Sequence, residues 1–183
     1  MTLKSLPVTK KAKDIRMIKD VYFSSFPKPE QAPFWFLMMR ARKDGIDFRA
    51  YYDGDALVGL AYYVLHGDLT FVVYLAVCKK NRSMGYGSQI LKQIKESHPD
   101  NRIILTIEMA NEKAQNNEQR VMRKKFYGKN GYAASGFIVE QRGDVFELLV
   151  HGGNCSAGDF EASFKKFIGS LIYYFVKPKL RNC

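Results

Sequence analysis

The residues with the clearest chemical potential form the run Arg82-Ser83-Met84-Gly85-Tyr86-Gly87. They follow a strongly apolar segment, Leu69–Val77, and they open a helix that the pattern predicts from about Gly85 to Ser97. Gly85 and Gly87 let the backbone approach a ligand closely, because glycine has no side chain. The free amides at a helix N-terminus attract anions, and Arg82 adds a charged hydrogen-bond donor. The segment therefore predicts a cradle for a pyrophosphate.

The spacing excludes two common phosphate-binding motifs. A P-loop requires Lys followed by Ser or Thr after its last glycine, and that pair is missing here. A dinucleotide fingerprint requires a third glycine three residues after Gly87, where Ile90 stands. The pattern that remains is Arg-x-x-Gly-x-Gly.

This pattern resembles the signature of the GNAT (Gcn5-related N-acetyltransferase) superfamily, which is Arg or Gln, two residues, Gly, one residue, then Gly or Ala. A second segment, Phe126-Tyr127-Gly128-Lys129-Asn130-Gly131-Tyr132, is similar to the family's Phe/Leu-Tyr-x-x-x-Gly-Phe/Tyr motif. The resemblance covers roughly residues 5–150. It implies a mixed α/β (α+β) acyl-CoA N-acyltransferase fold, acetyl-CoA as cosubstrate and an amine as acceptor.

The resemblance also implies which residues contact the coenzyme. Backbone amides at the helix start and Arg82 would hold the pyrophosphate, and the pantetheine arm would lie beside Leu75–Val77. A backbone N–H near Val77 would polarise the thioester carbonyl, as an oxyanion hole does. The expected contacts are Leu75, Ala76, Val77, Arg82, Ser83, Met84, Gly85, Tyr86, Gly87 and Ser88. The alternative is that the run is only a turn and a helix start.

Transfer to an amine requires a neutral nucleophile, a stabilised oxyanion and a proton for the departing thiolate. A free alkylamine has a pKa near 10.4, so a base is useful. The resemblance implies that Tyr127 is the acid, since a phenol is about 1.5 pKa units weaker than a thiol. Glu108 is the candidate base, because it ends a strand that is expected to lie beside the strand leading into the cradle, Leu69–Val77. The alternatives are a packing tyrosine, a solvated carboxylate and a water chain that replaces any single base.

The chain departs from the family pattern at two positions. The second motif commonly has Asn seven residues before the tyrosine and Ala four before it, where this chain has Arg120 and Arg123. These arginines share a helix face and could bind a coenzyme phosphate, bind an acidic part of the acceptor, or form a solvated basic face. Phe34 and Trp35 lie where the family often builds the acceptor wall, although such an aromatic cluster is also typical of a core.

The elements that would position these residues follow from the hydrophobic periodicity and the turn signals. Strands are expected near 5–9, 48–52, 57–65, 69–77, 102–108, 132–141 and 145–151, and helices near 14–26, 33–43, 85–97, 116–130 and 159–175. Asp14 is a predicted N-cap, and Asn116 with Gln119 a predicted capping box. The order predicts an α/β or α+β single domain over residues 1–183. Its core would span about 5–150, and the extra C-terminal helix would cap the sheet or pair two subunits in a homodimer.

The composition of the chain limits the kinds of site, the cellular location and the alternative functions that can be expected. Three widely spaced cysteines, Cys78, Cys155 and Cys183, argue against a disulfide framework or a zinc site, so no metal is expected. No apolar run reaches the roughly 18 residues of a membrane span, and no leader signature is present, so a cytoplasmic location is expected. The net charge of +11 attracts anions. Nucleic-acid binding is one alternative function, although no RNP-type or C₂H₂ motif supports it, and an acyl-CoA sensor without turnover is another.

Overall fold

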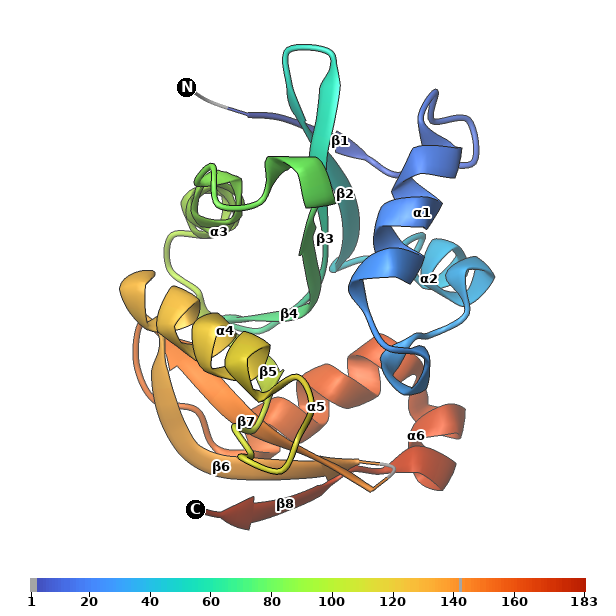
Figure 1. The fold of residues 1–183 in the computed structure, drawn as a ribbon. Helices are drawn as coiled ribbons and strands as arrows, with labels where there is room; N and C mark the ends of the chain where they lie inside the picture. The colour runs from blue at the N-terminus through green and yellow to red at the C-terminus, as the bar shows by residue number, and fades with distance from the viewer. Residues whose placement is uncertain (1–2, 142) are drawn as a thin grey trace. The chain divides into compact units, whose positions relative to one another are not determined.

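The computed structural model describes residues 3–141 and 143–183 (Figure 1). These residues form two compact units. The first unit comprises the chain up to residue 65 together with 72–99, and the second comprises 66–71 together with 100–183. Strand β4 (Leu69–Val77) begins in the second unit and ends in the first.

The first unit is built on antiparallel strands. Strand β1 (Lys4–Pro7) pairs with β2 (Ile46–Asp53), which pairs with β3 (Ala56–His66), and β4 follows β3. The predicted Asp53-Gly54 turn joins β2 to β3, and Gly54 adopts a φ of +56° that favours glycine. A 3₁₀ turn, η2 (Lys79–Asn81), leads from β4 toward helix α3 (Tyr86–Ser97).

Two further helices complete the first unit. Helix α1 (Ile15–Ser25) and helix α2 (Phe34–Arg40) are joined by a loop that contains the 3₁₀ turn η1 (Lys28–Glu30). Helix α1 buries Ile18 and Tyr22, which are four residues apart on one face, and α2 buries Leu37. Figure 1 shows α1 and α2 on one side of β2 and β3 and α3 on the other.

The second unit contains the last four strands of the eight-stranded sheet. Strand β7 (Asp144–His151) lies between β5 (Arg102–Glu108) and β6 (Ala133–Gln141), and β8 (Lys179–Asn182) pairs with the far side of β6. All these pairings are antiparallel. Helix α4 (Asn117–Lys129) connects β5 to β6, and helices α5 (Ala157–Ile168) and α6 (Ser170–Val176) precede β8.

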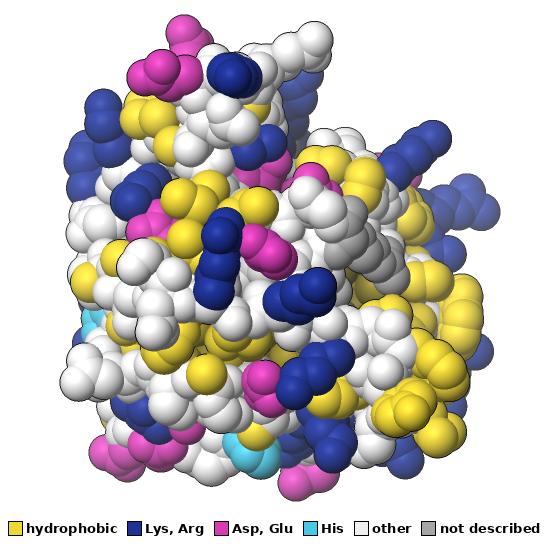
Figure 2. All heavy atoms as spheres, turned by 90° about the horizontal axis from the view of Figure 1, so that it is seen from below, with side chains coloured by type: hydrophobic (Ala, Val, Ile, Leu, Met, Phe, Trp, Pro, Cys, Tyr) yellow, Lys and Arg dark blue, Asp and Glu magenta, His cyan; other side chains and the backbone are white. Residues whose placement is uncertain are grey.

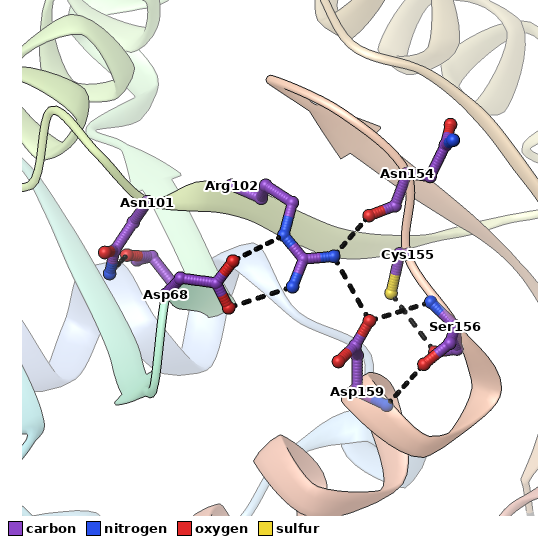
Figure 3. A network of polar contacts seen from close by, with 8 residues as sticks. Asp68, Asn101, Arg102, Asn154, Cys155, Ser156 and Asp159 are labelled. Carbon is purple, nitrogen blue, oxygen red and sulfur yellow. Dashed lines mark hydrogen bonds and ion pairs between the residues drawn. The ribbon is translucent and has the colours of Figure 1, made fainter.

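Arg102 ties the start of β5 to the start of α5 (Figure 3). Its guanidinium donates to Asp68 at 2.9 and 3.1 Å and to Asp159 at 3.2 Å. Asp159 also closes a capping box with Ser156, the N-cap of α5. The backbone N–H of Ser156, helped by Arg102, holds the pKa of the Asp159 carboxyl below its usual value. The contacts fix the α5 N-terminus within the second unit.

The prediction of one C-terminal helix over 159–175 is wrong. The hydrophobic periodicity continues, but Gly169 breaks the helix with φ 88° and ψ 151°, a conformation that essentially only glycine adopts. The residues beyond it form α6, whose Leu171, Tyr174 and Phe175 are strongly exposed, and then β8, which was not predicted. Figure 2 shows hydrophobic side chains gathered at the right-hand edge of the face drawn, with Lys and Arg side chains around them.

The two predicted helix caps stand at the expected positions, but their side chains make no capping hydrogen bonds. Asp14 stands at the N-cap of α1, but its side chain makes no capping hydrogen bond. Asn116 is the N-cap of α4 and forms no capping box with Gln119, because its side chain contacts other groups. Its amide donates to Glu108 at 3.4 Å, and its oxygen accepts from Arg120 at 2.8 Å. In the described part of the chain, no helix has the length and apolarity needed to cross a membrane.

Candidate active site

The predicted pyrophosphate cradle is an open loop at the N-terminus of α3. Residues 82–85 are exposed, and the chain turns through left-handed conformations at Ser83 (φ 63°) and at the N-cap Gly85 (φ 84°). The first amides of α3, from Tyr86 onward, have no acceptor within the helix, as at any helix start. The Tyr86 hydroxyl donates to Asp53 at 2.7 Å, which ties the loop to the β2–β3 hairpin and raises the pKa of Tyr86. The loop therefore offers free amides and Arg82 to an anion.

The end of β4 presents its backbone in a defined direction. The Cys78 amide donates to Val58 of β3 at 2.8 Å. Because successive amides of a strand point to opposite sides, the Val77 amide points away from β3. Leu75 and Val77 are half-buried, whereas Ala76 between them is buried. The Val77 amide therefore faces the side of β4 opposite to β3.

Gly59 permits the close packing of β3 against this part of β4, and sequence reasoning missed it. A Cβ at Gly59 would stand 2.5 Å from the Ala76 carbonyl oxygen and 2.9 Å from Ile90 of α3. A real Cβ does not approach a backbone atom so closely, so any other residue would displace the strand or the helix. The available signal was a lone glycine inside a long apolar strand, which often marks a close backbone approach.

Two tyrosine hydroxyls anchor the loop between α1 and α2. Tyr22 donates to the Ala32 carbonyl at 2.9 Å. Tyr74 of β4 donates to the Glu30 carbonyl at 2.7 Å and accepts from the Ala32 amide at 3.1 Å. Burial raises the pKa of Tyr22 strongly, so its hydroxyl stays protonated. No local sequence pattern predicted this role, because the partners are backbone atoms of another segment.

In the second unit, Glu108 is enclosed by arginines. Its side chain is 10% exposed, and its two oxygens accept from Arg120 at 2.9 Å and from Arg123 at 2.8 Å. Arg120 also donates to Asn116 and to the Met109 carbonyl at 3.0 Å, so its guanidinium is engaged on every side. The structure thus brings three predicted site residues together in one cluster. Neither arginine belongs to a purely solvated face, and both oxygens of the predicted base already carry strong donors.

Tyr127 is buried one helical turn after Arg123. Its ring contacts those of Phe126 and Tyr132, with centroids 5.0 and 5.6 Å away. Burial raises the pKa of Tyr127 to about 12, and the Arg123 charge opposes this rise. The phenol is therefore fully protonated at neutral pH, which is the form that an acid needs.

The two predicted acceptor residues have different environments. The Phe34 side chain is buried and contacts the rings of Tyr22 and Phe48. Trp35, which follows it, is 67% exposed. Of this pair, only Trp35 presents its ring to solvent.

A family comparison matches these observations. Residues 44–134 match the sequence model of the acetyltransferase (GNAT) domain, and this range contains both motifs, Arg82–Gly87 and Phe126–Tyr132. The chain belongs to the GNAT superfamily. The predicted mixed α/β acyl-CoA N-acyltransferase fold is thereby confirmed.

Solved structures show the same fold. A protein described as a GNAT-family acetyltransferase from Bacteroides thetaiotaomicron is similar with a TM-score of 0.72 and 20% identity, over 93% of this chain and 98% of that one. A GNAT acetyltransferase from Elizabethkingia anophelis with acetyl-CoA bound gives 0.59 and 12%, over 83% and 99%. Arabidopsis thaliana Naa50 in complex with a bisubstrate analogue gives 0.58 and 16%, over 84% and 100%. A comparison with curated protein sequences found no match.

Proposed function

We propose that this protein is an acetyl-CoA-dependent N-acetyltransferase that transfers an acetyl group to a primary amine by direct attack on the thioester. The observation that carries the proposal is the exposed loop at the start of α3, which combines Arg82, two left-handed residues and unpaired helix amides in a chain of the GNAT superfamily. Helix amides and an arginine suit a pyrophosphate.

The residues present fit the coenzyme. The amides of Met84, Gly85, Tyr86, Gly87 and Ser88, with Arg82 and the Ser83 turn, would hold the pyrophosphate. The β4 residues Leu75, Ala76 and Val77 would lie along the pantetheine arm, and the Val77 amide would donate to the carbonyl oxygen as negative charge develops there. Gly59 supports this geometry by allowing β3 to pack closely behind Ala76.

Tyr127 would supply the proton that the departing thiolate takes up. Its buried phenol carries that proton at all physiological pH values, because burial raises the pKa to about 12. A thiol has a pKa of about 8.5, so the proton would move in concert with cleavage of the carbon–sulfur bond rather than before it.

Glu108 is better placed to orient Arg123 than to accept a proton. A general base needs a free oxygen within reach of the proton that it removes. Both oxygens of Glu108 instead accept charge-assisted hydrogen bonds from Arg120 and Arg123 at 2.9 and 2.8 Å. We therefore assign Glu108 as a positioning residue, with deprotonation of the amine left to solvent. Arg123, which keeps exposed surface, is the proposed contact to the acceptor.

Thermal unfolding with and without acetyl-CoA tests the coenzyme site. At about a hundred times Kd, linkage predicts about 2.7 kcal/mol of stabilisation, or roughly 5–10 °C for a chain of this size. Pyrophosphate at equal concentration should give no such shift. Release of free coenzyme A on addition of amines then tests turnover. A thermal shift with acetyl-CoA but no turnover on any amine would indicate a coenzyme-binding sensor instead of an enzyme. The absence of a thermal shift at any acetyl-CoA concentration would refute the predicted pyrophosphate cradle.

A further inference from the structure

A groove between α1 and α2 of the first unit has the construction of a binding site for another molecule. Its volume of about 910 Å³ is near the upper end of the roughly 300–1,000 Å³ that ligand pockets span. Ile15, Lys19 and Phe23 form one wall, because residues four apart share a face of α1. Trp35, Met38 and Met39 form the wall contributed by α2.

The apolar surface of this groove is accessible and lies above a buried aromatic side chain. Trp35 is 67% exposed, and Phe23 and Met39 are each 46% exposed. Phe34, which is buried, forms the floor and is held by ring contacts with Tyr22 and Phe48. Large apolar side chains that gather in one exposed place mark interaction sites, and methionines adapt their shape to a partner.

The charged residues of the lining are all basic. They are Lys10, Lys19 and Arg42. Within residues 3–141 and 143–183, none of the three forms an ion pair with a carboxylate, and the Lys19 ammonium lies 5.4 Å from the Phe34 ring centroid. The three come from different places: before α1, in the middle of α1 and after α2. A ligand that satisfies them all carries several separated negative charges.

These features together favour one kind of partner. A fatty acid has a single carboxylate, and a second copy of this chain carries the same +11 charge and would bring like charges together. We propose that the groove binds an acidic amphipathic helix of a partner protein. Apolar side chains at the i, i+3, i+4 and i+7 spacing contact Phe23, Trp35 and Met39, and the partner's Asp and Glu side chains face the three cations. This binding is independent of the amine that the enzyme acetylates.

Trp35 reports occupancy directly, because it is the single tryptophan of the chain. The probe is a synthetic peptide of about 16 residues, long enough to form a helix, with Leu at that spacing and Glu at the other positions. We expect a saturable blue shift of Trp35 fluorescence, with an affinity that falls as salt rises. Arg42→Glu should weaken binding by about tenfold or more. The matched control Lys43→Glu changes an exposed neighbour outside the groove and should not.

A second pair of variants tests the apolar contact. Met39→Glu should abolish the shift, whereas Met17→Glu changes a methionine of equal exposure outside the groove lining and should leave it intact. Four results would overturn the proposal: no saturable shift, an equal shift with Lys in place of Glu in the peptide, a shift with oleate or anionic vesicles but not with the peptide, or a shift that appears with protein concentration alone. A shift with oleate or vesicles alone would indicate a lipid ligand, and a shift with protein concentration alone would indicate that a second copy of the chain fills the groove.

Discussion

Removal of the Tyr127 hydroxyl is the sharpest test of the proposed chemistry. A pKa of about 12 lies about 3.5 units above that of a thiol, which corresponds to about 5 kcal/mol for complete proton transfer. Such a phenol cannot protonate the thiolate in a separate step at low cost. It can donate while the bond breaks, and general acids of this kind contribute about 10²–10⁴-fold. Because the pKa is poorly matched, we expect Tyr127→Phe to lower kcat by about 10²-fold, at the low end of that range.

The assay is steady-state release of coenzyme A, together with the acetyl-CoA thermal shift. The thermal shift should be unchanged, because Tyr127 is not part of the predicted cradle. Since only the protonated phenol acts and its pKa is raised, its contribution is present at neutral pH and is lost only as pH approaches about 12. A fall in rate near pH 9 would belong to another group.

Tyr132→Phe is the matched control, because it removes a hydroxyl from the neighbouring ring, 5.6 Å away between centroids. This variant should retain most of its activity. Wild-type turnover by Tyr127→Phe would refute the acid assignment. An equal loss of kcat in both variants would show that activity depends on the packing of the aromatic cluster and not on the Tyr127 hydroxyl alone.

Four further predictions follow from the geometry. Gly85→Ala should weaken acetyl-CoA binding by about tenfold; a Cβ at Gly85 would meet no atom, so the effect would come from backbone strain at φ 84°. Gly54→Ala, the control with a φ of 56°, should lower stability without changing acetyl-CoA binding, which calorimetric titration measures. Gly59→Ala should destabilise the fold by about 1–3 kcal/mol in urea unfolding, because its Cβ would meet the strand behind it. Glu108→Gln should lower kcat about as much as Arg123→Gln, with no further loss in the double variant; a much larger loss for Glu108→Gln alone would restore it as the base. Asp159→Asn should cost on the order of 1 kcal/mol at pH 7. The pKa of Asp159 is lowered in the folded protein, so its contribution to stability is present above about pH 4, the usual pKa of a free Asp side chain, and is lost as pH falls through the lowered value. The difference in stability between the two proteins should therefore shrink steadily during acid titration.

The local sequence determined most of the elements and the family. The alternation and turn signals around Asp53-Gly54 predicted β2 and β3, and the predicted strand over Arg102–Glu108 matches β5 at both ends. The two glycine- and tyrosine-bearing motifs indicated the GNAT superfamily because they lie in short contiguous segments with fixed spacing. Predictions of this kind depend on residues that are neighbours along the chain.

Only the tertiary structure decided what the side chains do. Glu108 stands at a position in the sequence that suggested a general base, but two arginines of the following helix form ion pairs with both of its carboxylate oxygens. The periodicity that predicted one terminal helix could not reveal that Gly169 turns the chain away, nor that the residues after it pair with β6. The roles of Gly59, Tyr22 and Tyr74 depend on backbone atoms of other segments. The physical reason is the same in each case: local patterns encode conformation, whereas contacts between distant segments depend on packing that no local pattern records.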